Sequence, residues 1–228
     1  MRFLKTVVVG VSMLGACAAG ETIEAEYTGI AGGTSARHVK VRNEGTFYAG
    51  HMMHTITSGS RAGHSFGTFC VDVREYVRPG SLTYQVVDLA DAPMPGDPYG
   101  RAKADAVSAV IANAMALGWL DKNLQADSGA SDYLAKMGAI QAAVWGALGY
   151  QIRDDSWRTS SDLNTYYDIL LHDDTFDSSL RTNGLRAMVA PNQQDMLYIV
   201  PLPPAAFAGA GVLAVGFGIR VMRRHKQA

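Results

Sequence analysis

Two side chains in this sequence have types that can react with each other, the thiol of Cys70 and the carboxamide of Gln141. Cys70 lies in residues 66–73, FGTFCVDV, where aromatic and β-branched residues predict a strand. Gln141 lies inside the apolar stripe of residues 131–150, whose three- and four-residue spacing predicts a helix. An unpaired buried carboxamide costs about 1–3 kcal/mol, so Gln141 needs either hydrogen-bond partners or a chemical role.

The cysteine count favours the chemical role. The chain has two cysteines, and Cys17 lies in an apparent export signal, so the mature protein would hold Cys70 alone. An odd thiol in an oxidising compartment needs a reason. A thiolate facing a glutamine side chain can attack its carbonyl carbon, expel ammonia and leave an internal thioester, which would consume both the thiol and the amide.

The two motifs resemble those of the bacterial thioester domains of surface adhesins. That family has an aromatic residue or leucine before the cysteine, and later an apolar-Gln-x-x-apolar-Trp motif on a helix. This chain has Phe69 before Cys70 and runs from Ile140 through Gln141 to Trp145, in the same order. Many members have threonine where this chain has Ile140. The resemblance covers two short motifs in the central half of the chain.

The resemblance implies a Cys70–Gln141 thioester that captures an amine on a target surface, such as a protein lysine or a polysaccharide amine. It implies supporting roles for Trp145, which would cover the bond, and for the motif residues Phe69 and Ile140. It implies no cofactor and no metal. Capture would be a single covalent event, so the protein is expected not to be an enzyme.

Both ends of the chain carry targeting features. Residues 1–20 have two basic residues, an apolar run and small residues, which predict a cleaved secretory signal peptide. Leu14 to Cys17 also approximates a lipoprotein cleavage box. Residues 201–228 contain an uncharged apolar run followed by a basic tail, which predicts a C-terminal transmembrane helix.

The C-terminal segment begins with a proline-rich lead, VPLPP, at residues 200–204. Together with the basic end, it resembles the PEP-CTERM sorting signal of exosortase substrates, here in a VPLP form. The resemblance implies export to the cell surface or extracellular matrix of a Gram-negative bacterium, with membrane anchoring and a sorting enzyme of exosortase type as partner. A plain tail anchor would explain the same residues without a sorting enzyme.

Residues 21–200 fit one globular domain. All 21 acidic residues fall in this range, whereas six of the 20 Lys and Arg lie outside it, which leaves a net charge of −7. Nucleic-acid binding needs a basic face, so this balance argues against a nucleic-acid partner.

The predicted fold class is α+β. Four strands are expected before residue 90 and two near the end of the domain, and an inserted bundle of about three helices is expected over residues 101–172. The strands would form an antiparallel sheet or sandwich, with a strand cysteine meeting a helix glutamine. The expected strands are residues 38–42, 46–56, 66–73, 82–89, 181–189 and 195–200. The expected helices are residues 101–120, 132–149 and 161–171.

Six histidines invite a metal site, but His51 and His54 would point to opposite faces of one strand, so they are expected to be ordinary surface residues. His54 and His64 are candidate proton shuttles. Two other functions stay open: a passive structural or matrix protein with a free Cys70, and a cysteine hydrolase or transglutaminase-like enzyme with Cys70 as nucleophile.

Overall fold

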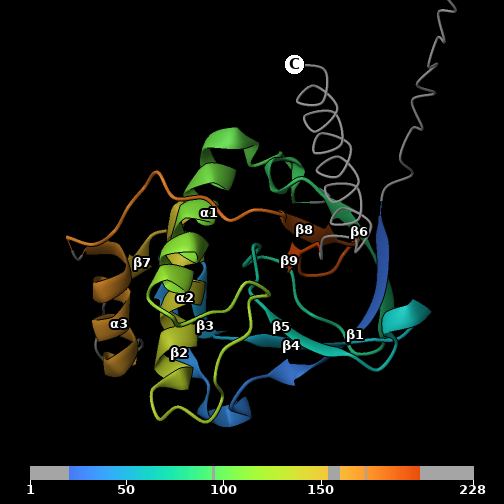
Figure 1. Ribbon diagram of the computed structural model, residues 1–228, viewed down its shortest axis with the longest axis horizontal. Coiled ribbons are helices and arrows are strands. Elements are labelled where there is room, and N and C mark those ends of the chain that lie inside the picture. The colour runs from blue at the N-terminus through green and yellow to red at the C-terminus, as the bar shows by residue number, and fades with distance from the viewer. Residues whose placement is uncertain (1–20, 94–95, 154–159, 173, 201–228) are drawn as a thin grey trace, which may run out of the picture.

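The computed structural model describes residues 21–93, 96–153, 160–172 and 174–200. The expected signal peptide at residues 1–20 and the expected anchor at residues 201–228 lie outside the described residues. Within the described part, an α+β domain combines a large antiparallel sheet with a helical layer on one side of it (Figure 1). No described helix has both the length and the apolar character needed to cross a membrane.

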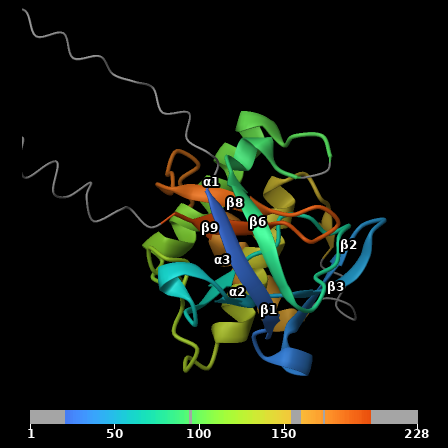
Figure 2. The ribbon, with the colours of Figure 1, turned by 90° about the vertical axis from the view of Figure 1, so that its right-hand side faces the viewer.

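The large sheet has six strands in the order β5-β4-β1-β6-β8-β9, and every pairing is antiparallel. Figure 2 shows β1 and β6 side by side across it. Its strands are β1 (Thr22–Ile30), β4 (Met52–Ile56), β5 (Ser65–Thr68), β6 (Ser81–Val87), β8 (Leu185–Val189) and β9 (Met196–Ile199).

The chain just beyond β5 joins the two edges of this sheet. Cys70 forms an isolated antiparallel bridge with Met196 of β9. On either side of it, Leu197 N–H donates to Phe69 O at 2.8 Å and Val71 N–H donates to Asp195 O at 2.9 Å. The first and last strands of the sheet are therefore linked at Cys70, and the sheet closes into a ring there.

A smaller sheet holds β2 (Arg37–Val41), β3 (Gly45–Ala49) and β7 (Ile152–Arg153) in the order β3-β2-β7. The β2–β3 hairpin turns at Asn43, with φ 63°, as the Asn-Glu-Gly sequence predicts. The pairing of β7 with β2 at Val41 and Ile152 was not expected from the sequence, because a two-residue strand has no periodicity of its own.

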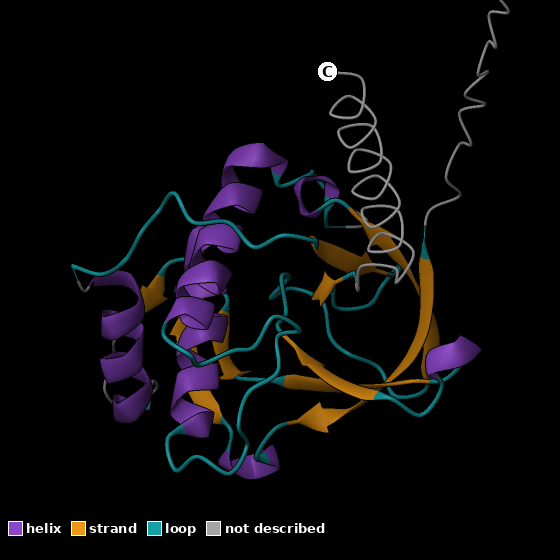
Figure 3. Ribbon diagram, viewed as in Figure 1, coloured by secondary structure: helices purple, strands orange, loops and turns teal. Residues whose placement is uncertain are grey.

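The helical layer contains α1 (Gly100–Ala116), α2 (Tyr133–Ala147) and α3 (Ser161–His172), so the predicted helical insertion is confirmed (Figure 3). The middle helix, α2, contacts α1, α3 and all strands of the small sheet. It is therefore buried on nearly all sides, whereas the sequence predicted one apolar stripe.

Residues 66–73 do not form one continuous strand, because β5 ends at Thr68 and Cys70 makes an isolated bridge beyond it. A second predicted strand is also wrong. Residues 46–56 form β3 and β4, which belong to different sheets. The segment holds aromatic, aliphatic or β-branched residues on both sides of Gly50, so its composition favours a strand throughout. The break occurs where the His51 ring is held by the Tyr133 hydroxyl at 3.1 Å and by the Leu124 carbonyl at 2.7 Å. These are tertiary contacts that no local pattern shows.

Gly138 of α2 lies where the helix packs most closely on its neighbours. A Cβ placed there would lie 2.8 Å from Leu163 Cδ1 and 2.9 Å from Arg37 Cβ, so this glycine lets the helix approach α3 and β2 closely. We expect Gly138→Ala to destabilise the protein, because overpacking costs about 1–3 kcal/mol and exceeds the gain of about 1 kcal/mol in helix propensity. Urea unfolding measures the difference.

Gly146→Ala is the matched control in the same helix. Its Cβ would lie 3.2 Å from the terminal hydroxyl of Tyr167, a milder contact than the two below 3.0 Å at Gly138. This change should therefore cost clearly less than Gly138→Ala, and equal effects at the two glycines would contradict the packing argument.

Candidate functional site

The side chain of Gln141 lies directly on the backbone of Cys70. Gln141 Oε1 accepts a hydrogen bond from Cys70 N–H at 2.8 Å, and Gln141 Nε2 donates to Cys70 O at 2.8 Å. The two residues are 71 positions apart in the chain. The structure thus brings the predicted cysteine and glutamine together.

Strand geometry explains why Cys70 needs this glutamine. Phe69 O and Val71 N–H point toward β9, so the N–H and C=O of Cys70 point to the other side of the strand. There β4 begins at Met52, opposite Thr68, and does not extend to Cys70. The two polar atoms of the Gln141 carboxamide take the place of the missing strand.

The Cys70 thiol is buried, with 1% of the residue exposed, and donates to the backbone oxygen of Asp72 at 2.9 Å. Burial raises the pKa of this thiol well above its ordinary value, and the nearby carboxylates of Asp72 and Asp195 raise it further. The Trp145 indole and the Asp72 backbone act in the opposite direction. The thiol is therefore protonated at neutral pH, and Cys70 forms no disulfide.

Cys70 and Gln141 line a cavity of about 340 Å³, here called the cysteine cavity. Trp145 lines it too and is 2% exposed, with its ring edge against Phe47 at 6.0 Å between centroids. Trp145 Nε1 lies near the thiol without hydrogen-bond geometry, so it is buried without an acceptor in the described part of the chain. The other lining residues are Tyr27, Ile30, Thr46, Phe47, Tyr48, Met52, Val73, Glu75, Tyr76, Val77 and Gln194.

Two residues predicted to support the pair lie elsewhere. Phe69 and Ile140 are fully buried in the hydrophobic cluster on the opposite side of the strand, and neither lines the cysteine cavity. Phe69 stacks on the His51 ring at 4.9 Å. Strand alternation accounts for Phe69, because neighbouring residues of a strand point to opposite faces. Ile140 lies in α2, where successive residues are turned about 100° from each other, so it faces a different neighbour from Gln141.

The predicted surface positions of His51 and His54 are wrong. They are 2% and 0% exposed, and burial lowers the pKa of each to about 4. His54 packs among the rings of Tyr27, Phe66 and Tyr84, and its Nε2 has no hydrogen-bond partner among the described residues. The aromatic residues that enclose it come from three strands, so sequence alone does not show the burial.

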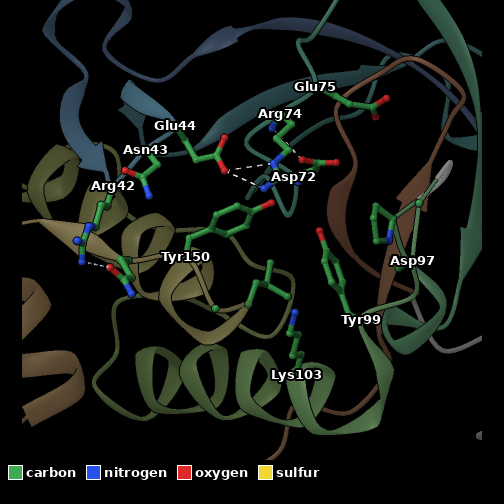
Figure 4. Close-up of a pocket in the computed structure, with 15 residues that line it drawn as sticks. Arg42, Asn43, Glu44, Asp72, Arg74, Glu75, Asp97, Tyr99, Lys103 and Tyr150 are labelled. Carbon is green, nitrogen blue, oxygen red and sulfur yellow. Dashed lines mark hydrogen bonds and ion pairs between the residues drawn. The ribbon is translucent and has the colours of Figure 1, made fainter.

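A second cavity of about 860 Å³, here called the polar cleft, lies next to the cysteine cavity and shares Glu75 with it. Figure 4 shows the hydroxyls of Tyr99 and Tyr150 pointing toward Asp72, with Arg74 bonded to Glu44. None of these residues was predicted from the sequence. Asp72 and Arg74 belong to a charged run after Cys70 that is short enough to pass for a surface turn. Glu44, Tyr99 and Tyr150 lie far from that run in the chain and carry no local signal.

In the part of the chain that the structure describes, no group of three or more His, Cys, Asp or Glu side chains is arranged to hold a metal ion.

The two buried histidines, His51 and His54, are expected to make the folded protein less stable in acid. Each histidine has a pKa of about 4 in the folded state and about 6.5 in the unfolded state. Between pH 4 and pH 6.5, such a histidine is therefore neutral in the folded protein and takes up a proton when the protein unfolds. Stability is therefore complete above about pH 6.5 and falls toward pH 4, by about 1.4 kcal/mol per pH unit for each histidine.

Urea unfolding of His54→Phe between pH 8 and pH 4.5 tests this. The variant should lose about half of the histidine-dependent slope, since one of the two groups is gone. The comparison at pH 8 separates any packing damage from the pH effect. An unchanged slope would show that His54 is already protonated in the folded state.

Comparison of the chain with known protein families, with curated proteins and with solved structures finds no match.

Proposed function

We propose that this protein captures amines covalently through an internal thioester between Cys70 Sγ and the side-chain carbonyl carbon of Gln141. The observation that carries the proposal is the docking of the Gln141 carboxamide onto Cys70 itself by two 2.8 Å hydrogen bonds. The buried free thiol and this carboxamide line the same cavity, so the two groups that thioester formation requires belong to one site.

In the forming step, Sγ attacks the Gln141 carbonyl carbon, the C–N bond breaks, and the thiol proton leaves on nitrogen as ammonia. The attack places negative charge on Oε1, which already accepts the Cys70 N–H at 2.8 Å. That N–H would stabilise the oxyanion of the tetrahedral intermediate. The buried thiol is protonated at rest, so its proton is available for the departing ammonia.

In the capture step, an amine attacks the thioester carbonyl carbon, the C–S bond breaks, and an amide joins the target to Gln141. The thiol is regenerated and takes a proton from the amine. Ammonia has been lost by then, so the site reacts once and does not turn over. Cys70 and Gln141 are each 1% exposed, and Trp145 packs beside them, which would slow hydrolysis of the bond.

The setting of this chemistry is proposed from the sequence. A signal peptide at residues 1–20 and a sorting signal or anchor at residues 201–228 favour a protein displayed on the cell surface or in the matrix of a Gram-negative bacterium. Its partner would be an amine-bearing surface molecule, and adhesion would be the biological result. The net charge of −7 over residues 21–200 disfavours nucleic acid.

A passive structural role is the second candidate, and one observation favours it. Both polar atoms of the Gln141 carboxamide are hydrogen-bonded to Cys70, so the glutamine is satisfied without any reaction. A cysteine hydrolase has less support. The polar contacts of Cys70 among the described residues come from Asp72 and Gln141, not from a histidine base.

Intact mass distinguishes the two candidates. We expect the non-reduced protein to weigh one ammonia less than its sequence, and to regain one methylamine on exposure to that amine. Cys70→Ser is the matched control, because it keeps the backbone bonds to Gln141 and removes the thiol. A wild-type protein of unmodified mass would rule out the thioester and support the structural role.

Stability measurements on Cys70→Ala, Gln141→Ala and the double variant extend the test. A thioester closing 71 residues should contribute about 2–4 kcal/mol, as a disulfide of similar loop length does, and either single change should remove it. Gln141→Ala should cost about 1–3 kcal/mol more than Cys70→Ala, since it leaves the buried Cys70 N–H and C=O unpaired.

The double variant should then be no less stable than Gln141→Ala, because two residues that make one bond are not additive. Additive thermal midpoints across the four proteins would mean that no bond joins the two side chains.

A further inference from the structure

The carboxylate of Glu75 is the one charged group that lines the cysteine cavity among the described residues. Its Oε2 is buried and has no hydrogen-bond partner in the described part of the chain. Leaving a carboxylate oxygen buried and unpaired costs free energy, so such a group is expected to have a ligand. Glu75 is five residues beyond Cys70, on the segment that carries the thiol.

The surroundings of Glu75 leave its charge largely uncompensated. Burial raises its pKa, the Asp72 carboxylate raises it further, and Arg78 lowers it. Arg74 is engaged with Glu44 at 2.8 Å, and Figure 4 shows the Glu75 carboxylate lying apart from that pair. The other titratable or charged groups along the polar cleft are Arg42, Asp97, Tyr99, Lys103 and Tyr150.

The remaining wall of the cysteine cavity is mostly aromatic and aliphatic. Tyr27, Phe47 and Met52 line it, and Tyr48 and Tyr76, which are 48% and 74% exposed, lie at its solvent side. An alkyl chain ending in an ammonium group suits such a cavity, because its methylenes pack on the rings while its charge meets the carboxylate.

We propose that Glu75 binds the ammonium group of the incoming amine and accepts the proton that must leave before the nitrogen can attack. The proposal rests on the thioester proposed above. An alkylammonium ion has no free electron pair, so R–NH₃⁺ first gives one proton to Glu75. The resulting R–NH₂ forms the C–N bond as the C–S bond breaks, its second proton passes to sulfur, and Glu75 then releases its proton to water.

This role makes Glu75 a selectivity group for cationic amines, and two nucleophiles test it. Methylamine is an ammonium ion at neutral pH, whereas hydroxylamine is uncharged there. In the full chain in detergent, Glu75→Gln should react about 100-fold more slowly with methylamine, the lower range for a lost proton acceptor, and equally fast with hydroxylamine. Intact mass, followed over time, measures both rates.

The pH dependence supplies a readout that a purely structural role would not move. Because Glu75 takes its proton from the ammonium form, wild-type capture per methylammonium ion should be constant above the raised pKa of Glu75 and should show an acid limb below it, where the protonated acid cannot accept a proton. Methylamine capture by Glu75→Gln needs the free amine, so it should follow the free-amine fraction with no break at this pKa. Capture of hydroxylamine, expressed per free base, should also lack the break.

Asp97→Asn is the matched control, since Asp97 lines the polar cleft but not the cysteine cavity, and the change leaves the Arg74–Glu44 pair intact. It should react with both nucleophiles at the wild-type rate. If Glu75→Gln does not fold, Glu75→Asp keeps the carboxylate and should retain the pH limb at a reduced rate.

The outcomes separate the two proposals. A wild-type protein that has not lost ammonia overturns the thioester and this inference together. A thioester present in every variant, with methylamine rates unchanged by Glu75→Gln or with both nucleophiles slowed equally, overturns the role of Glu75 alone.

Discussion

The closure of the large sheet at Cys70 is the constraint on which the rest of the structure depends. Its bridge to Met196 directs the Cys70 N–H and C=O away from β9, toward a side where β4 has not yet begun. Buried backbone groups must be paired, and no strand is available. The carboxamide of Gln141 pairs both groups, which fixes the rotation and height of α2 against the sheet. The close approach at Gly138 and the contacts of α2 with the small sheet follow from this position.

The same constraint gives the site its chemical character. A glutamine that pairs with the backbone of a cysteine has its carbonyl oxygen on the N–H of that cysteine, where an oxyanion would form on attack. Burial protonates the thiol and excludes water from the carbonyl carbon. A structural glutamine and a reactive one therefore share one starting geometry. The chemistry of the bond, rather than the placement of the residues, distinguishes the two functions.

The sequence predicts most of the elements and the central pair, because each depends on local signals. Periodicity identifies the three helices, and the odd thiol together with the odd amide identifies Cys70 and Gln141. The break at residues 50–51 and the strand β7 depend on tertiary contacts, so local patterns miss them. The prediction of a surface position for His54 fails for the same reason, because the rings that bury it come from three strands. Glu75 is missed because an acid in a charged run looks like any surface acid until the fold buries its Oε2.

The segment from Cys70 to Glu75 shows how a short stretch can serve both purposes. Cys70 still belongs to the closed sheet, whereas the residues after Asp72 leave it and border both cavities. Asp72 turns the chain by accepting the Arg74 N–H at 2.8 Å, and its carboxylate keeps negative charge beside Glu75. The turn that ends the strand thus also sets the charge of the cavity wall. A cationic amine would meet that charge before it reaches the carbonyl carbon, so electrostatic attraction and nucleophilic attack would follow one path into the site.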